Sequence, residues 1–325
     1  MHPQRILITG SSGFYGRAVV ERIQKTWPDA EILGLDLVPP KSDPPTRFEK
    51  CDITSPQLRE HVMQFQPDTI VHLAFVVNPM RDEKRMHQIN VGGSRNLLSA
   101  AAEVKPARLL VSSSATAYGA WPDNPVPLTE KHPLRTRPEY RYADDKFQVE
   151  GLLHEFAAAY PGTAVSWTRP CIIHGPGLTN YMTPLFTVPP VLALPGGSNS
   201  LMQFVHLEDV ADATIAILGA SARGAFNVAP PDWVTIRDLA KMSRRFAIPV
   251  PFAACLALTT CWWALRLPIF RFPAPLWYFI RYPWVVSSDR LMSEIGFQFK
   301  YSSDDVIRQL LKDAGKLKTQ PMDSE

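Results

Sequence analysis

The stretch that most constrains the fold lies near the start of the chain, where a short aliphatic run meets three glycines. Residues 6–8 are aliphatic, Gly10, Gly13 and Gly16 follow at three-residue spacing, and residues 18–20 begin a helical pattern. The pattern predicts a strand, a tight turn and a helix. Glycines let the backbone turn sharply and approach a ligand, and the free N–H groups at a helix start favour a pyrophosphate.

An acidic residue ends the next apolar run. Residues 31–35 lead into Asp36, which lies twenty residues beyond Gly16. A carboxylate at this place accepts hydrogen bonds from both ribose hydroxyls of NAD and repels the additional phosphate of NADP. A surface aspartate at a strand end is the alternative, but the preceding glycine loop makes it less favoured. Asp36 therefore predicts NAD as the cofactor.

Apolar runs and helical patterns alternate through the first half of the chain. The expected strands cover 48–53, 69–74 and 107–114, and the expected helices cover about 55–65 and 81–104. In the first of these helices, Ser55 is the expected N-cap. This rhythm predicts an α/β fold with a parallel, doubly wound sheet. Ligands bind at the carboxyl ends of such strands, where Gly10, Asp36, Ala74 and Ser114 fall.

A tyrosine and a lysine four residues apart open a further helix, expected to end near residue 160. Lys146 lies one turn beyond Tyr142, so both side chains share one helix face. A free tyrosine has a pKa of about 10, and a neighbouring ammonium and the positive nicotinamide ring would favour its phenolate. Tyr142 is therefore the candidate base for a substrate hydroxyl, and Ser114 the candidate that holds the same oxygen.

Together these motifs resemble those of the extended short-chain dehydrogenases/reductases, in the NAD-dependent epimerase/dehydratase family, from the first strand to about Phe299. The matching positions are Thr9 to Gly16, Asp52-Ile53, His72-Leu73-Ala74, Asn90-Val91, 112–119, Tyr142 with Lys146, Arg169-Pro170, 174–176 and 204–211. The resemblance implies a Rossmann sheet with a smaller C-terminal substrate lobe. It also implies an NAD-dependent enzyme in which Ser114, Tyr142 and Lys146 are catalytic.

The same resemblance supplies an expected set of cofactor contacts, in which Asp52 and Ile53 lie along the adenine and Lys146 also binds the nicotinamide ribose. The full set is Gly10, Gly13, Phe14, Tyr15, Gly16, Asp36, Asp52, Ile53, Leu73, Ala74, Asn90, Ser112, Tyr142, Lys146, Pro170, Ile172 and Ile173. The expected NAD-binding core covers 1–170 and about 203–229. The substrate lobe covers 171–202 and 230–318, and a disordered tail follows at 319–325. A homodimer through two helices beside the sheet is expected by analogy.

Three histidines are expected to have structural roles. His72 lies in an apolar strand and should be a satisfied core or near-cofactor residue, and His174 should make a loop hydrogen bond. His206 and Asp209 mark a strand-to-helix junction, where an aspartate caps and a histidine packs. None of these residues is expected to do direct chemistry.

Two positions depart from the family's sugar-nucleotide pattern. Ala115 and Thr116 stand where dehydratases carry Asp-Glu, which disfavours elimination of water, and Ile172 stands where sugar-nucleotide epimerases carry a phosphate-binding asparagine. The motif around 169–177 is more similar to hydroxysteroid-dehydrogenase-like members. The interpretation preferred from sequence is hydride transfer at a secondary alcohol or ketone of a lipophilic, steroid- or lipid-like substrate. A sugar-nucleotide epimerase and a non-catalytic NAD-binding sensor or assembly subunit are the alternatives.

The second half of the chain holds an unusual run without acidic residues. Positions 239–288 contain no Asp or Glu, six Lys or Arg and four of the eight tryptophans, and 252–265 carry no charge. A spanning helix needs roughly 20 apolar residues, so this run is too short. It is interpreted as an apolar lobe packed on the core, an element between 250 and 284 that contacts a membrane surface, or a lid over a greasy substrate.

Charge and cysteine usage bound the remaining possibilities. The formal net charge is +3 and no zinc-finger or RNA-binding spacing is present, so no nucleic-acid partner is expected. Four scattered cysteines form no CxxC pair, and no metal site is expected. A strand begins almost at the first residue, so no signal peptide is expected. The expected location is the cytoplasm, with membrane association as the further option. Ser302 and Asp305 predict a capping box for a last helix.

Overall fold

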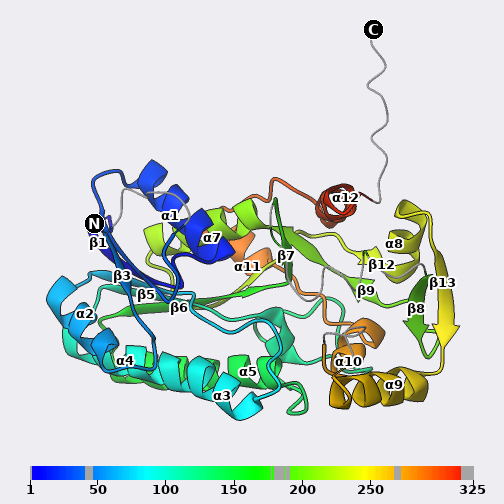
Figure 1. Ribbon diagram of the computed structural model, residues 1–325. Coiled ribbons are helices and arrows are strands. Elements are labelled where there is room, and N and C mark those ends of the chain that lie inside the picture. Colours follow the sequence, from blue (N-terminus) through cyan, green and yellow to red (C-terminus); the bar gives the residue numbers. More distant parts are fainter. Residues whose placement is uncertain are drawn as a thin grey trace, which may run out of the picture.

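A seven-stranded parallel sheet forms the centre of the fold in the computed structural model (Figure 1). The structure describes residues 2–40, 47–176, 178, 187, 191–266 and 272–315. The strand order is β11-β6-β5-β4-β1-β2-β3. The strands are β1 (Arg5–Thr9), β2 (Glu31–Asp36), β3 (Arg47–Lys50), β4 (Thr69–His72), β5 (Arg108–Ser112), β6 (Ala164–Pro170) and β11 (Gly224–Val228). The doubly wound α/β fold predicted from the sequence is confirmed.

Helices cover both faces of this sheet. On one face lie α1 (Phe14–Thr26), α7 (Leu207–Gly219) and α11 (Asp289–Ile295), and on the other lie α2 (Gln57–Phe65), α3 (Glu83–His87), α4 (Gly93–Val104) and α5 (Arg141–Ala159) (Figure 1). Because both faces of the strands are covered, successive side chains are all buried, and the strand sequences are continuous hydrophobic runs. In β1, Ile6, Leu7 and Ile8 are fully buried.

Smaller paired strands and short helices lie outside the main sheet, and most of them fall in the second lobe. The strands pair as β10 (Phe204–His206) with β7 (Ile172–His174), β12 (Val234–Thr235) with β9 (Leu201–Met202), and β13 (Phe246–Val250) with β8 (Val191–Pro195). The helices are α8 (Ile236–Met242), α9 (Phe252–Ala264), α10 (Leu276–Arg281) and α12 (Ser303–Asp313). Figure 1 shows β13 and α9 at the end of the molecule opposite β1–β3. No helix in the described part of the chain is both long and apolar enough to cross a bilayer.

One hydrophobic core joins the two parts of the fold. It includes Ile6, Ile8 and Val19 beneath α1 and α7, and it continues to Leu194 and Phe279 in the second lobe. A second core on the opposite face of the sheet packs α2, α4 and α5. The second lobe is thus attached through buried side chains of one sheet face.

The long helix predicted for 81–104 is confirmed from Glu83 to Val104, but its middle turn is π-helical. The segment is α3, a π-helical turn (Gln88–Gly92) and α4 in succession, and Asp82 caps α3 by accepting a hydrogen bond from the Arg85 N–H. The Asn90 side chain, inside the π turn, accepts from Val76 N at 2.8 Å and donates to Asp145 at 3.0 Å. Such turns widen a helix locally and are frequent at functional sites.

Several element ends also differ from the sequence prediction. Ser55 does not cap α2: the helix begins at Gln57, and the Ser55 hydroxyl has no partner among the described residues. Helix α11 ends where Gly296 adopts φ +71°. The capping box of Ser302 and Asp305 is confirmed. The tail expected at 319–325 lies outside the described residues.

Candidate active site

The glycine loop closes on the strand beside it. Gly10 has φ +74°, and a Cβ there would lie 2.6 Å from the Ala74 nitrogen. A Cβ on Gly16 would lie 2.1 Å from the Gly10 oxygen. Gly13 is exposed and is the N-cap of α1 without a side-chain cap, so the first N–H groups of the helix are open to a ligand. The loop fits a dinucleotide pyrophosphate.

Asp36 ends β2 directly beside this loop. Its carboxylate accepts hydrogen bonds from Ser12 N at 3.0 Å and Leu37 N at 2.7 Å, and it is half-buried. Both oxygens keep lone pairs for ribose hydroxyls. The predicted adenine-side residue Asp52 accepts from the Thr54 amide at 2.8 Å and the Thr54 hydroxyl at 2.7 Å. The adjacent Ile53 packs tightly on Gly93 at the start of α4.

The three predicted catalytic residues come together at the carboxyl end of β5. Ser114 caps a short 3-10 helix (Ala115–Tyr118), and its Oγ accepts a hydrogen bond from the Thr116 hydroxyl at 3.0 Å. The Ser114 hydroxyl also lies near enough to the Tyr142 phenol to lower its pKa. The two hydroxyls that would hold a substrate oxygen therefore lie near one another.

Lys146 lies beneath this pair. It is buried, its Nζ donates to the Ser112 carbonyl at 2.6 Å, and it lies 5.9 Å from the Tyr142 ring centroid. Burial lowers the pKa of Lys146 to about 7, although Glu150 and Asp145 oppose the shift. Burial raises the pKa of Tyr142 to about 12, opposed only by the Ser114 hydrogen bond. The expected lowering of the Tyr142 pKa is therefore not seen in the protein alone, because desolvation outweighs the contribution of Ser114.

Sequence reasoning missed Phe75. The Lys146 Nζ lies 3.4 Å from the centroid of the Phe75 ring, and this ring meets Tyr142 edge-on at 5.7 Å between centroids. The position directly after Ala74, at the carboxyl end of β4, was the available signal. Phe75 shields both ionisable groups from water.

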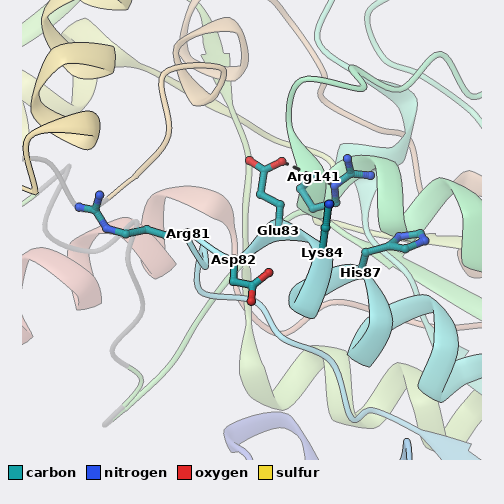
Figure 2. A pocket seen from close by; sticks show the side chains of 6 residues that line it. All are labelled: Arg81, Asp82, Glu83, Lys84, His87 and Arg141. Atoms are coloured by element: carbon teal, nitrogen blue, oxygen red, sulfur yellow. Dashed lines mark ion pairs between the residues drawn. The ribbon is translucent and has the colours of Figure 1, made fainter.

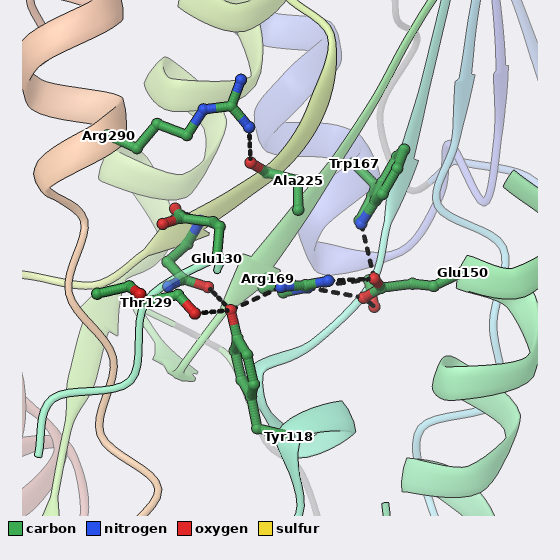
Figure 3. A network of polar contacts seen from close by, with 10 residues as sticks. Tyr118, Thr129, Glu130, Glu150, Trp167, Arg169, Ala225 and Arg290 are labelled. Atoms are coloured by element: carbon green, nitrogen blue, oxygen red, sulfur yellow. Dashed lines mark hydrogen bonds and ion pairs between the residues drawn. The ribbon is translucent and has the colours of Figure 1, made fainter. Parts of the chain in front are cut away.

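A buried polar network fixes the helix that carries Tyr142 and Lys146 (Figure 3). Glu150, one turn beyond Lys146, accepts from Arg169 at 2.6 Å, Ser113 at 2.5 Å and Trp167 at 2.7 Å. Arg169 also donates to the Tyr118 hydroxyl at 2.6 Å. Because Ser113 lies between Ser112 and Ser114, the network ties α5 to the end of β5. The spacing of four residues from Lys146 was the signal that could have identified Glu150.

Other predicted cofactor residues line the strand ends in different ways. Leu73 and Ala74 follow β4 against Gly10, and Pro170, Ile172 and Ile173 lie where β6 passes into β7. Phe14 stacks beneath Arg17, with 5.0 Å between the guanidinium carbon and the ring centroid.

Two members of the predicted set use their side chains inside the protein. The Tyr15 hydroxyl pairs with Thr214 of α7 at 2.5 Å, and burial raises its pKa. Asn90 is fully buried and bonded to Val76 and Asp145. Of Tyr15, the backbone rather than the hydroxyl is therefore left to contact a cofactor. The Asn90 side chain holds the segment after β4 in place through Val76.

The expected role of His72 is confirmed, whereas that of His174 is wrong. His72 is buried between Thr9 Oγ1 at 2.6 Å and Ser94 Oγ at 3.0 Å, and burial lowers its pKa to about 3. His174 makes no loop hydrogen bond within the described residues: its Nε2 lies 3.6 Å from an Asp313 oxygen.

At the junction before α7, the expected packing of His206 is confirmed, since its ring lies 4.0 Å from the Tyr301 ring between centroids, and the expected cap by Asp209 is wrong. His206 caps the helix by accepting from Glu208 N, whereas Asp209 accepts from the backbone of Lys300 at 3.1 Å. The imidazole reaches the helix N–H because His206, not Asp209, occupies the N-cap position.

A cavity of about 510 Å³ opens beside the helix start that carries Tyr142 (Figure 2). Its lining side chains are Arg81, Asp82, Glu83, Lys84, His87 and Arg141. The Arg141 guanidinium lies 3.8 Å from Glu83, so the cavity bridges the start of α3 and the start of α5. Among the described residues no group of three or more metal-ligating side chains gathers.

This fold and this site define an NAD-dependent enzyme of the extended short-chain dehydrogenase/reductase type. The model of the "NAD dependent epimerase/dehydratase family" matches residues 6–229. The chain therefore belongs to the NAD-dependent epimerase/dehydratase family.

Related proteins are identical to this chain at about a quarter of the aligned positions. An uncharacterized protein of Mycobacterium tuberculosis is 23% identical over 319 residues, which cover 94% of this chain and 84% of that protein. The trifunctional UDP-glucose 4,6-dehydratase/UDP-4-keto-6-deoxy-D-glucose 3,5-epimerase/UDP-4-keto-L-rhamnose-reductase RHM1 of Arabidopsis thaliana is 27% identical over 259 residues, covering 74% of this chain and 39% of that protein.

Solved structures share the fold over both lobes. A UDP-glucose 4-epimerase of Thermus thermophilus in complex with NAD has a TM-score of 0.73 at 20% identity, covering 96% of this chain and 99% of the other. A dTDP-glucose 4,6-dehydratase of Bacillus anthracis in complex with NAD has a TM-score of 0.72 at 17% identity, covering 96% and 97%.

Proposed function

We propose that this protein is an NAD-dependent epimerase that inverts a secondary alcohol carbon of a sugar nucleotide. The observation that carries the proposal is the Tyr142–Ser114 hydroxyl pair, placed above buried Lys146 and at the same sheet edge as the Gly10 loop. A proton acceptor, an oxygen-binding hydroxyl and a dinucleotide cradle are the parts that alcohol oxidation needs.

The chain's own residues would handle the proton and the oxygen. Tyr142 accepts the proton of the substrate hydroxyl, and Ser114 donates a hydrogen bond to that oxygen as it becomes a carbonyl. When bound, NAD supplies the hydride acceptor; Gly10, Gly13, Gly16 and Asp36 would hold it. The pKa of Lys146 is about 7, so a large fraction of the side chain is protonated at neutral pH. Its positive charge near the phenol would favour the phenolate.

The residues after Ser114 support epimerisation over dehydration. Ala115 is buried and apolar, and the Thr116 hydroxyl is used by Ser114 at 3.0 Å. Neither side chain is an acid or base that could remove water from a neighbouring carbon. The sugar-nucleotide substrate is supported by the family and by the sugar-nucleotide enzymes among its relatives.

A substrate deuterated at the carbinol carbon tests this proposal. The purified protein is incubated with nucleotide sugars labelled at C4, and the product is analysed by mass spectrometry and NMR. An epimerase returns the deuterium to the inverted carbon without net formation of reduced cofactor. Loss of the label from the sugar, or no conversion of any nucleotide sugar, would contradict it.

A lipophilic secondary alcohol is the second candidate substrate, and the apolar helix α9 favours it. The guanidinium of Arg81, which lines the cavity beside α5, lies 4.7 Å from the Trp263 ring centroid of α9. An apolar element therefore borders the approach to the site. Incubation with a hydrophobic alcohol and NAD should then form one reduced cofactor for each ketone. The nucleotide-sugar assay, in contrast, expects no net reduced cofactor.

A further inference from the structure

Helix α9 is apolar on every side and yet lies at the surface. Its thirteen residues carry no charge, and in this fully described helix only Cys255 and Thr259 are buried. Its exposed positions are Ala253, Ala257, Leu258, Thr260, Cys261 and Ala264. Leu258 is 52% exposed, and Leu265, directly after the helix, is 70% exposed. A helix without a polar face normally belongs in an interior, so this one lacks a partner for its outer face.

The strand that precedes α9 extends this surface. In β13, Phe246 is 79% exposed and Ile248 is 42% exposed, and Pro251 leads directly into the helix. Both elements lie at the end of the molecule farthest from β3 (Figure 1). We call the four side chains Phe246, Ile248, Leu258 and Leu265 the apolar end.

Positive charge borders the apolar end and negative charge is absent from its sequence. Lys241 and Arg244 are exposed at and just after the end of α8, where Lys241 lies 3.8 Å from Asp238, and Arg266 is exposed just after α9. The chain has 31 acidic residues, yet none falls within 239–288. A protein partner of ordinary composition would not require this one-sided charge, whereas a surface of lipid phosphates would attract it.

We propose that the apolar end docks on a membrane surface that contains anionic lipid. The exposed leucines and Phe246 enter the boundary between headgroups and acyl chains, and Lys241, Arg244 and Arg266 meet lipid phosphates. At thirteen residues α9 is shorter than the roughly 20 needed to span, so it lies in the surface. The inference does not depend on the substrate proposed above.

The docked surface adjoins the cavity described above. Arg81 donates a hydrogen bond to the Trp263 carbonyl near the end of α9, and the same side chain lines the cavity (Figure 2). Docking through α9 therefore holds the cavity close to the lipid headgroups.

Vesicle flotation of the full-length protein tests the proposal. Vesicles of phosphatidylcholine alone are compared with vesicles that also contain phosphatidylglycerol, at low and high salt. We expect flotation only with the anionic lipid and less of it at high salt. Leu258→Glu with Leu265→Glu should abolish flotation. Arg244→Gln with Arg266→Gln should weaken it by about five-fold for each cation removed.

Controls separate docking from misfolding and from self-association. Trp233→Glu places one glutamate on a 36%-exposed aromatic outside the apolar end and should float like the wild type, whereas Leu258→Glu alone should already weaken flotation. If the double variant Leu258→Glu with Leu265→Glu fails to fold, which circular dichroism would reveal, the double variant Arg244→Gln with Arg266→Gln still tests the proposal. Absence of flotation with both lipids overturns the proposal. So does a wild-type dimer in light scattering that Leu258→Glu converts to monomer without any lipid binding.

Discussion

At the scale of single residues, Tyr142 lies in surroundings that oppose its own ionisation. Burial raises its pKa to about 12, and the Ser114 hydroxyl only partly offsets this. The phenolate must therefore be created by charge that arrives with the cofactor and by Lys146 in its protonated form. The protein alone holds the tyrosine neutral and ready to hydrogen-bond.

Tyr142→Phe should abolish turnover while leaving NAD affinity nearly unchanged. The substitution removes one hydroxyl and keeps the ring that packs against Phe75, so we expect kcat to fall by about 10²- to 10⁴-fold. Steady-state kinetics measures the first effect and calorimetric titration of NAD the second. Unchanged turnover would refute the assigned role.

Lys146 makes stability depend on pH. Its pKa is about 7 in the fold against a usual 10.5, so between these values the unfolded chain binds more protons than the folded one. The free energy of unfolding should therefore rise with pH across this window, by up to about 1.4 kcal/mol per pH unit from this group. Lys146→Met should flatten the rise in urea titrations at pH 7, 8 and 9. Equal slopes for both proteins would contradict the burial argument.

At the scale of elements, the contact between α5, β5 and β6 depends on one buried ion pair. Glu150 and Arg169 are 1% and 4% exposed by side chain, at 2.6 Å. Glu150→Gln leaves the Arg169 charge without its carboxylate, and breaking such a pair costs about 3–5 kcal/mol. Chemical denaturation measures the loss. Glu103→Gln, which removes an exposed carboxylate from a pair with Arg59 at 2.6 Å, should leave stability nearly unchanged.

The glycine loop is equally intolerant of added atoms. Gly10→Ala places a methyl 2.6 Å from the Ala74 nitrogen in a backbone with positive φ, so the loop must shift away from β4. We expect NAD affinity to fall at least ten-fold by calorimetry. Gly151→Ala is the matched control, because position 151 is exposed on α5 and nothing lies within 4 Å of the added methyl. It should stabilise the helix by about 0.5–1 kcal/mol. Equal NAD affinity in both variants would contradict the close approach.

Sequence periodicity predicted the sheet well, because buried parallel strands are continuous aliphatic runs, and it predicted Ser114, Tyr142 and Lys146 as neighbours. It did not predict the π turn at Asn90, since that turn depends on Val76 and Asp145, which come from other segments. It also missed Phe75, whose role depends on how closely β4 and α5 approach. Local patterns fix elements, whereas these contacts are set by packing between elements.

At the scale of the whole molecule, the second lobe shares a core with one face of the sheet. Ile8 beneath α1 and Leu194 and Phe279 in the lobe belong to the same buried cluster. Scanning calorimetry should therefore show one unfolding transition, and Leu194→Ala should lower its midpoint without splitting it. Two separated transitions would mean that the lobes unfold independently.

This shared core also bears on how such a chain could be re-engineered. A substrate lobe transplanted from a relative would arrive with side chains shaped for another sheet face, because Leu194 and Phe279 complement particular neighbours on this one. Exchange of specificity by grafting the lobe alone should then yield insoluble hybrids. The lobe should therefore be transferred together with the side chains of the NAD-binding part that share its core, among them Tyr140, whose ring lies 5.3 Å from that of Phe279 between centroids.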